Sequence, residues 1–294
     1  MLESNQFRTI EVSGFKLNCL VEGEGIPVLV PGSAIYYPRI FSSEIKKHLQ
    51  FIHIDHRGFV PPPAEDLDNS VFDLDVLIED FEEARAYLGL DKFIVMGHSG
   101  HAFMALEYAK QYPEHVTGVI MIGVTPDYSH TTHKAAEDFF EKEASPERKK
   151  ALEKGMANLQ EMIAADPEKR FVSYCLAAAA KSWFDHDFHA AALWEDLYTN
   201  MQAIDHIWGV VFRNIDVTKG LSDFDKPVLL MLGKYDFLTG PTELWDDIKN
   251  NFKDITIRVF EKSAHCPMYE EAELFDKALL SWLSAKQIAN TNGR

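Results

Sequence analysis

Short apolar runs alternate along most of the chain with longer segments in which apolar residues recur every three or four positions. The runs lie at residues 28–30, 51–54, 93–96, 119–122, 228–232 and 255–260. Runs of this length, rich in branched apolar residues, are typical of buried parallel strands, and the segments between them are long enough for crossover helices. The pattern predicts an α/β fold: a mostly parallel twisted β-sheet flanked by helices.

Two of the longer segments have the spacing of amphipathic helices. The apolar positions of the first are Leu74, Leu77, Phe81, Ala84 and Leu88, and those of the second are Phe275, Ala278, Leu279 and Trp282. Positions three and four apart share one face of a helix, so each set forms a stripe that can pack on the sheet. We expect the first helix to end at Gly89, because glycine is the usual residue after a helix C-terminus.

The alternation stops near Pro126 and resumes near Pro227. The interval is rich in alanine, glutamate, lysine and histidine, and its helical stretches are broken at Pro146 and Pro167. We therefore expect two parts. One is an α/β core domain formed by residues 1–125 and 223–294. The other is a helical cap inserted at residues 126–222.

Charge and composition narrow the classes of partner. The 294 residues include 46 acidic and 29 basic side chains, a net charge of -17, which would repel nucleic acid and anionic lipid surfaces. No leader sequence and no apolar stretch long enough for a membrane span is recognisable, so we expect a cytoplasmic protein that binds a small molecule. The three cysteines, Cys19, Cys175 and Cys266, are widely spaced and indicate neither a disulfide framework nor a thiolate zinc site. The oligomeric state cannot be inferred.

The clearest chemical motif is VMGHSGHA at residues 95–102, between a predicted strand and a predicted helix. A serine in a sharp strand-turn-helix connection is typical of a nucleophile elbow. A serine hydroxyl is a weak nucleophile at neutral pH, so Ser99 would need a histidine to accept its proton and a carboxylate to orient that histidine. A serine that only capped a helix would need neither.

Both partners are found in later turns. Asp236 lies in GKYDFLTGP after the next-to-last apolar strand, and His265 lies in EKSAHCPMYEE after the last one. The carboxyl ends of parallel strands meet at one edge of a sheet, so these side chains should lie close to Ser99. Asp127, after the strand that precedes the insertion, is a second candidate for the acid.

The chain order Ser99, Asp236, His265 resembles that of the α/β-hydrolase fold family, over nearly the whole chain. VLVPGSA at residues 28–34 is similar to the family's oxyanion loop, and IDHRGFV at residues 54–60 is similar to its D-x-R-G segment. The resemblance implies a serine hydrolase that forms an acyl-enzyme on Ser99. Its oxyanion hole would consist of the Gly100 N–H and the N–H of Ser33 or Ala34.

Two positions depart from the family pattern. Pro31 stands where the family usually has a histidine, and His101 stands where the second small residue of the elbow is usual. We expect the His101 ring either to lie beside the helix or to point into the acyl pocket, which makes it a candidate substrate-binding residue. A dehalogenase or epoxide hydrolase of this fold would be expected to carry aspartate at position 99, so those activities are disfavoured.

The substrate class rests on the shorter motif AAALWEDLYTN in the insertion. Its Trp194-Glu195 pair is similar to a pair in the cap of the proline iminopeptidase branch, where the glutamate binds the free amino terminus of the substrate. The resemblance implies an aminopeptidase, with a small-molecule carboxylesterase or a non-catalytic receptor on the same fold as alternatives. No nucleotide-binding glycine motif is present, and the four H-x-x-H pairs lack an H-E-x-x-H helix or a thiolate cluster, so we expect no cofactor and no metal.

Overall fold

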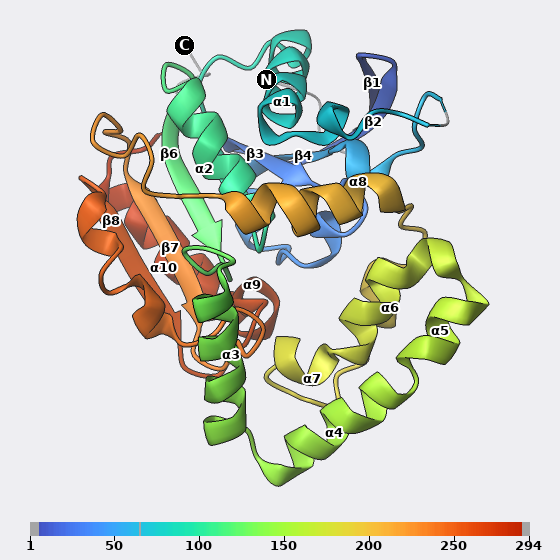
Figure 1. The fold of residues 1–294 in the computed structure, drawn as a ribbon. Coiled ribbons are helices and arrows are strands. Elements are labelled where there is room, and N and C mark those ends of the chain that lie inside the picture. Colours follow the sequence, from blue (N-terminus) through green and yellow to red (C-terminus); the bar gives the residue numbers. More distant parts are fainter. Residues whose placement is uncertain (1–5, 65, 290–294) are drawn as a thin grey trace.

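One sheet of eight strands runs through the centre of the computed structural model, which describes residues 6–64 and 66–289 (Figure 1). The strand order is β1-β2-β4-β3-β5-β6-β7-β8. All pairs from β4 through β8 are parallel, whereas β1 pairs antiparallel with β2, and β2 antiparallel with β4. The strands are β1 (Gln6–Val12), β2 (Phe15–Gly23), β3 (Ile26–Gly32), β4 (Leu49–Asp55), β5 (Phe93–His98), β6 (Val116–Ile122), β7 (Val228–Gly233) and β8 (Ile255–Phe260). The predicted mostly parallel α/β sheet is confirmed.

The two N-terminal strands were not among the six apolar runs. β1 is an edge strand whose side chains are in turn exposed and half-buried over its first half, so its sequence QFRTIEV is mostly polar. β2 lies between β1 and β4, and its residues alternate between buried and less buried, as in a strand with one covered face. A search for continuous apolar runs finds strands covered on both faces and misses strands covered on one.

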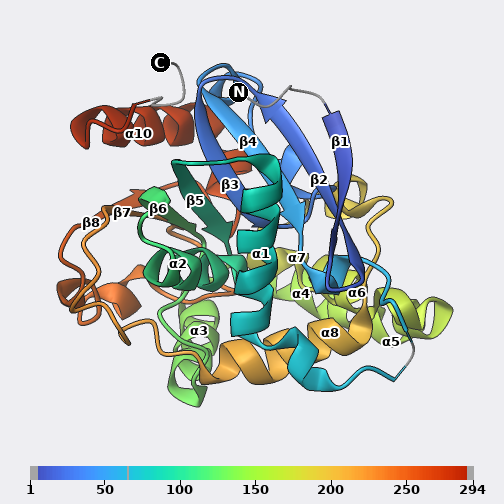
Figure 2. The same cartoon turned by 90° about the horizontal axis from the view of Figure 1, so that it is seen from above.

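Helices cover both faces of the sheet. Figure 2 shows α1, α2 and α8 on one side and α10 on the other. The helices are α1 (Leu74–Leu88), α2 (His101–Gln111), α3 (His130–Glu143), α4 (Pro146–Ala157), α5 (Leu159–Ala165), α6 (Arg170–Ala177), α7 (Ala179–Ser182), α8 (Met201–His206), α9 (Pro267–Glu270) and α10 (Ala272–Ala285). As expected, α1 ends at Gly89, whose φ of 67° is left-handed.

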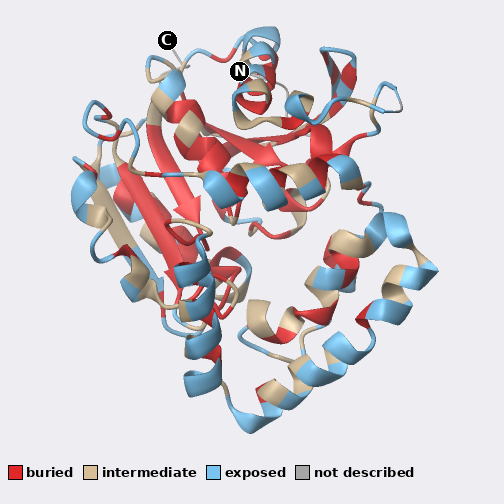
Figure 3. Ribbon diagram, viewed as in Figure 1, coloured by how far each residue is buried: buried red, intermediate tan, exposed pale blue. Residues whose placement is uncertain are grey.

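Two apolar layers sandwich the sheet, and strands β3 to β7 between them are almost wholly buried (Figure 3). Alternate residues of β5 show the division: Val95 joins the layer under α1 and α2, whereas Ile94 and Met96 join the layer under α10. Successive side chains of a strand point to opposite faces, so a strand with helices on both sides is apolar throughout.

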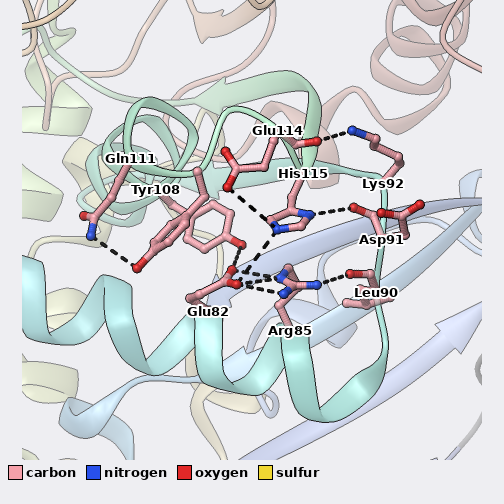
Figure 4. Close-up of polar contacts among 10 residues, drawn as sticks. Glu82, Arg85, Leu90, Asp91, Lys92, Tyr108, Gln111, Glu114 and His115 are labelled. Atoms are coloured by element: carbon pink, nitrogen blue, oxygen red, sulfur yellow. Dashed lines mark hydrogen bonds and ion pairs between the residues drawn. The ribbon is translucent and has the colours of Figure 1, made fainter.

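Helix α2 is fixed to α1 by a polar contact away from the carboxyl edge of the sheet. The fully buried Tyr108 of α2 donates its hydroxyl to Glu82 of α1 at 2.7 Å. Arg85 donates to the same carboxylate, as Figure 4 shows. The contact joins the C-terminal half of α2 to α1, away from the turn that holds Ser99.

All elements that the structure describes between β6 and β7 are helical. We call residues 126–222 the inserted segment; its helices α4 to α7 stand beyond the carboxyl ends of the strands in Figure 1. Its last part returns to the sheet, where Ala203, Ile207 and Phe212 belong to the apolar layer under α2. The predicted division into core and cap stays a prediction.

Candidate active site

Ser99 lies in the turn between β5 and α2. Its φ of 58° is left-handed, a strained conformation for a residue with a side chain, and its N–H donates to Ile122 O at 2.8 Å. A Cβ at Gly97 would lie 2.2 Å from the His101 carbonyl oxygen, so only glycine fits there. The Ser99 side chain is partly exposed, in the geometry of a nucleophile elbow.

Asp236 and His265 form a buried pair at the same edge of the sheet. Asp236 follows β7 and His265 follows β8, and His265 Nδ1 lies 2.8 Å from Asp236 Oδ2. The other carboxylate oxygen of Asp236 accepts the N–H groups of Leu238 and Thr239 at 3.0 and 3.1 Å. The carboxylate is thus held so that it can orient the imidazole and leave Nε2 to act as a base.

His265 also lies close to the elbow. Its ring centroid is 4.5 Å from that of His98, the residue before Ser99, and the buried His98 Nε2 lies 2.9 Å from the His265 carbonyl oxygen. No hydrogen bond joins Ser99 Oγ to the His265 ring in the described parts of the chain. This contact is commonly long in ligand-free active sites and shortens when substrate binds.

Two other polar residues follow β6. Tyr128 lies close to the Ser99 side chain, and burial raises the pKa of its hydroxyl to about 12. Asp127, the second candidate for the acid, accepts Ser129 N–H and the Thr132 hydroxyl at 2.7 Å each. It therefore orders the start of α3, and the carboxylate that pairs with His265 is Asp236.

The inserted segment holds the loops of Asp236 and His265 through hydrogen bonds. The carbonyl oxygens of Lys181 and Ser182, at the end of α7, accept the N–H groups of Phe237 at 3.2 Å and His265 at 3.0 Å. Glu270 accepts the N–H groups of Phe184 at 2.5 Å and Ala264 at 2.8 Å. The segment and the two loops therefore form one connected structure.

In the loop after β3, which we expect to be the oxyanion loop, one of the expected donors is already bonded within the protein. Ala34 N–H donates to the buried Asp55 carboxylate at 2.7 Å and is not available to a substrate. The N–H groups of Ser33 and Gly100 form no hydrogen bond among the described residues. These two N–H groups are therefore the remaining candidates to donate to an oxyanion.

His101 does not have the substrate-binding position considered for it. The buried ring lies 2.6 Å from the Tyr37 hydroxyl through Nδ1 and 3.0 Å from His56 through Nε2. Both ring nitrogens are therefore occupied by protein. The elbow tolerates this side chain because Gly97 is crowded by the backbone of residue 101, not by its ring.

The side chains of Trp194 and Glu195 lie in different environments. Trp194 is half-buried and its ring lies against Tyr36 of the oxyanion loop, with centroids 4.4 Å apart. The Glu195 side chain is exposed, and its carbonyl oxygen accepts from Arg39 Nη1 at 2.6 Å. An exposed carboxylate is poorly placed to bind the ammonium group of a substrate in a closed pocket, which was the expected role of Glu195.

Several polar residues around the site were missed by sequence reasoning. Tyr37 and His56 contact His101 from positions 64 and 45 residues away, and Glu270 accepts the Phe184 N–H from 86 residues away, so no local pattern connects these partners. The two glutamates of EKSAHCPMYEE are the one signal that could have been used, because an acidic pair after a turn can accept the N–H groups of that turn.

Two features are absent from residues 6–64 and 66–289. No three histidine, cysteine or acidic side chains are placed together to hold a metal ion. No helix has the length and apolar character that a membrane crossing requires.

Comparison with known proteins places this arrangement in a family. The sequence matches the family described as the alpha/beta hydrolase fold over residues 28–272. The chain therefore belongs to the α/β-hydrolase fold family, as the order of its motifs indicated.

Individual relatives agree with this assignment. The AB hydrolase superfamily protein YclE of Bacillus subtilis is 47% identical over 270 residues, covering 92% of this chain and 96% of that protein. A proline iminopeptidase of Neisseria gonorrhoeae is 25% identical over 241 residues, 74% of each chain. The crystal structure of a proline iminopeptidase from Mycobacterium smegmatis superposes with a TM-score of 0.72 at 18% identity, covering 96% of this chain and 98% of that one. At that identity the structural likeness shows the fold.

Proposed function

We propose that this chain is a serine hydrolase that cleaves small neutral carboxylic esters through an acyl-enzyme on Ser99. The observation that carries the proposal is the buried Asp236–His265 pair, 2.8 Å apart, at the sheet edge that also holds the strained Ser99 elbow. A helix-capping serine would have no need of an oriented imidazole beside it.

In the proposed reaction, Ser99 Oγ attacks the ester carbonyl while His265 Nε2 takes the hydroxyl proton. The carbonyl oxygen becomes an oxyanion, held by the N–H groups of Ser33 and Gly100. When the C–O bond to the leaving group breaks, His265 returns the proton to the departing alcohol. A water molecule then attacks the acyl-enzyme, with His265 again as base, and releases the carboxylic acid and free Ser99.

The preference for a neutral ester rests on the side chains that the inserted segment brings to the site. Trp194 packs on Tyr36, and Trp208 packs on His101 with ring centroids 5.5 Å apart. Glu195, the carboxylate suggested for binding an amine, is exposed. Aromatic side chains favour apolar acyl groups over the charged amino terminus of a peptide. We propose that this segment is the cap of the site.

The first prediction concerns activity and labelling of the purified protein. Wild type should hydrolyse p-nitrophenyl acetate, butyrate and benzoate, and should react covalently at Ser99 with a fluorophosphonate. Ser99→Ala should lose the labelling and nearly all turnover, up to about a millionfold, with its circular dichroism spectrum unchanged. Prolyl and alanyl arylamides should be poor substrates.

Two other results would each contradict the proposal in a distinct way. A folded wild type that neither turns over esters nor labels at Ser99 would favour a ligand-binding receptor. Efficient cleavage of aminoacyl arylamides, impaired by Glu195→Gln but not by the matched exposed change Asp196→Asn, would favour an aminopeptidase.

A further inference from the structure

Three buried polar side chains from three separate places in the chain meet beside the elbow. His101 is the first residue of α2, Tyr37 begins the short helix η1 (Tyr37–Arg39) after the oxyanion loop, and His56 follows β4. Tyr37 Oη lies 2.6 Å from His101 Nδ1, and His101 Nε2 lies 3.0 Å from His56 Nε2. The contacts join positions 64 and 45 residues apart in sequence.

The outer contacts of this cluster determine where its protons lie. Gly58 N–H donates to His56 Nδ1 at 2.9 Å, so the proton of a neutral His56 is on Nε2. That N–H donates to His101 Nε2, so the His101 proton is on Nδ1, where it donates to Tyr37. The Tyr37 hydroxyl donates in turn to the His98 carbonyl oxygen at 3.2 Å. Protonation of either ring would convert a ring nitrogen that accepts a hydrogen bond into a donor, so that two N–H groups would face each other.

The surroundings keep both rings neutral. Burial lowers the pKa of His56 to about 3 and holds the pKa of His101 well below its ordinary value. The other titratable groups that face His101 are His98 and Tyr37, and neither carries a negative charge that would favour an imidazolium. Phe59 and Trp208 cover the ring, with centroids 5.9 and 5.5 Å away.

Two glycines leave the space that the Tyr37 and His56 rings occupy. A Cβ at Gly32, whose φ is 144°, would lie 2.3 Å from the Tyr37 ring. A Cβ at Gly58 would lie 2.5 Å from the His56 ring. Atoms other than hydrogen do not approach this closely, so glycine at both positions allows the loops to close around Tyr37 and His56.

The cluster joins the two chain segments that carry the proposed oxyanion donors. Gly100 directly precedes His101, and Ser33 is linked to Tyr37 through the Tyr37 N–H, which lies 3.4 Å from Ser33 O. The hydrogen bond between Tyr37 and His101 therefore connects the segment that contains Ser33 N–H to the segment that contains Gly100 N–H. A change in its length would change the separation of the two donors.

We propose that His56, His101 and Tyr37 form a neutral hydrogen-bonded brace that sets the oxyanion loop at its working distance from the nucleophile elbow. His101 and Tyr37 are then positioning residues that do not touch the substrate. The inference rests on the proposed serine hydrolase function and goes beyond it, because it assigns a role to the residue at which this chain departs from the usual elbow.

The kinetic test compares Tyr37→Phe and His101→Leu with wild type on p-nitrophenyl butyrate. Each should lower kcat by about 10- to 100-fold and leave KM within about threefold, because an oxyanion donor acts mainly in the transition state. The double variant should be no slower than the slower single variant, since both break one unit. His101→Gln should restore most of the rate, because an amide can accept from His56 and donate to Tyr37.

Tyr108→Phe is the matched control. It removes another fully buried tyrosine hydroxyl, also bound to an element next to α2, but at the far contact with Glu82 (Figure 4). It should lower Tm and leave kcat unchanged. Equal losses of kcat in Tyr37→Phe and Tyr108→Phe, or an unchanged kcat in folded Tyr37→Phe, would overturn the brace.

A second measurement does not depend on activity. In nitrogen-15 NMR spectra of wild type at pH 7, His56 should be the neutral Nε2–H tautomer and His101 the neutral Nδ1–H tautomer. Tyr37→Phe should shift the amide resonances of Ser33 and Gly100, and Tyr108→Phe should not. If wild type neither labels nor turns over, the proposed function fails and these spectra still decide on the brace. A charged ring, the opposite tautomers or unshifted amides would refute it.

Discussion

At the residue scale, Asp55 lies behind the oxyanion loop, where one carboxylate oxygen accepts Ala34 N–H and the other accepts Asn18 Nδ2, each at 2.7 Å. Burial raises the pKa of Asp55 to about 7, although these hydrogen bonds act in the opposite direction. A carboxyl group that keeps its proton in the folded protein and loses it in the unfolded chain makes stability depend on pH.

We predict that this dependence is visible in the free energy of unfolding. The folded pKa of Asp55 is raised, so its stabilising contribution is complete below pH 4 and is lost as the pH rises to about 7. Asp55→Asn cannot titrate, and the difference in stability between variant and wild type should change by up to about 4 kcal/mol across that interval. Urea unfolding of both proteins at pH 4.5 and 7.5 measures it, and a difference that is equal at the two pH values would contradict the prediction.

Some residues of the candidate site could be predicted from the sequence and others could not. Ser99, Asp236 and His265 each stand in a turn after an apolar strand, so position along the chain was enough to propose them. Tyr37 and His56 have no such signal, because their roles depend on contacts with His101 across 64 and 45 residues. The sequence showed that position 101 was unusual but did not show where its ring points.

At the scale of elements, a buried ion pair joins the turn after β4 to α1. Arg57 Nε and Nη2 each lie 2.6 Å from an oxygen of Asp80, and Arg57 Nη1 donates to Val71 O at 2.9 Å. The Arg57 guanidinium also lies over the Phe15 ring, 4.5 Å from its centroid. The arginine of the D-x-R-G segment therefore fixes the turn that contains His56 against the helix layer.

We predict that Asp80→Ala destabilises the protein by about 3–5 kcal/mol, because it leaves a buried guanidinium without its counter-ion. The double variant Arg57→Met, Asp80→Leu should recover much of that loss, since it removes both charges. Thermal and urea unfolding provide the measurement. If the single and double variants were equally unstable, the loss would come from packing and not from the unpaired charge.

Elements covered on both faces were the ones that the pattern predicted well. β3 to β7, α1 and α10 lie where the apolar runs and stripes placed them, since a fully buried strand or a one-sided helix has a clear pattern. β8, at the other edge of the sheet and only partly buried, was also found from its apolar run. β1 and β2, at the edge of the sheet, and the separate short helices of the inserted segment carry weaker patterns. Their positions depend on neighbours that a local window does not contain.

At the scale of the whole molecule, several neutral histidines are buried close together. Burial lowers the pKa of His56 to about 3, and it holds those of His98 and His101 well below the ordinary histidine value. The unfolded chain takes up protons on these rings below about pH 6.5, whereas the folded chain does not.

We therefore predict a steep loss of stability on the acid side. Stability from a depressed histidine pKa is present above pH 6.5 and falls as the pH decreases toward 3, by about 1.4 kcal/mol per pH unit for each ring. In His56→Gln, the slope of the unfolding free energy between pH 6 and 4.5 should be shallower than in wild type by about that amount. Identical slopes would mean that His56 is protonated in the folded protein.

The hydrogen bonds between the inserted segment and the loops of Asp236 and His265 affect how freely such segments can be exchanged between relatives. Phe237 N–H and His265 N–H donate to Lys181 O and Ser182 O, and Phe184 N–H donates to Glu270. A chimera that replaced residues 126–222 as a block would leave these groups unpaired unless the incoming segment offered two carbonyls to Phe237 and His265 and an N–H to Glu270 in the same places. We therefore expect a chimera to keep the Asp236 and His265 loops ordered only when its junctions leave residues 181–184 together with residues 223–294.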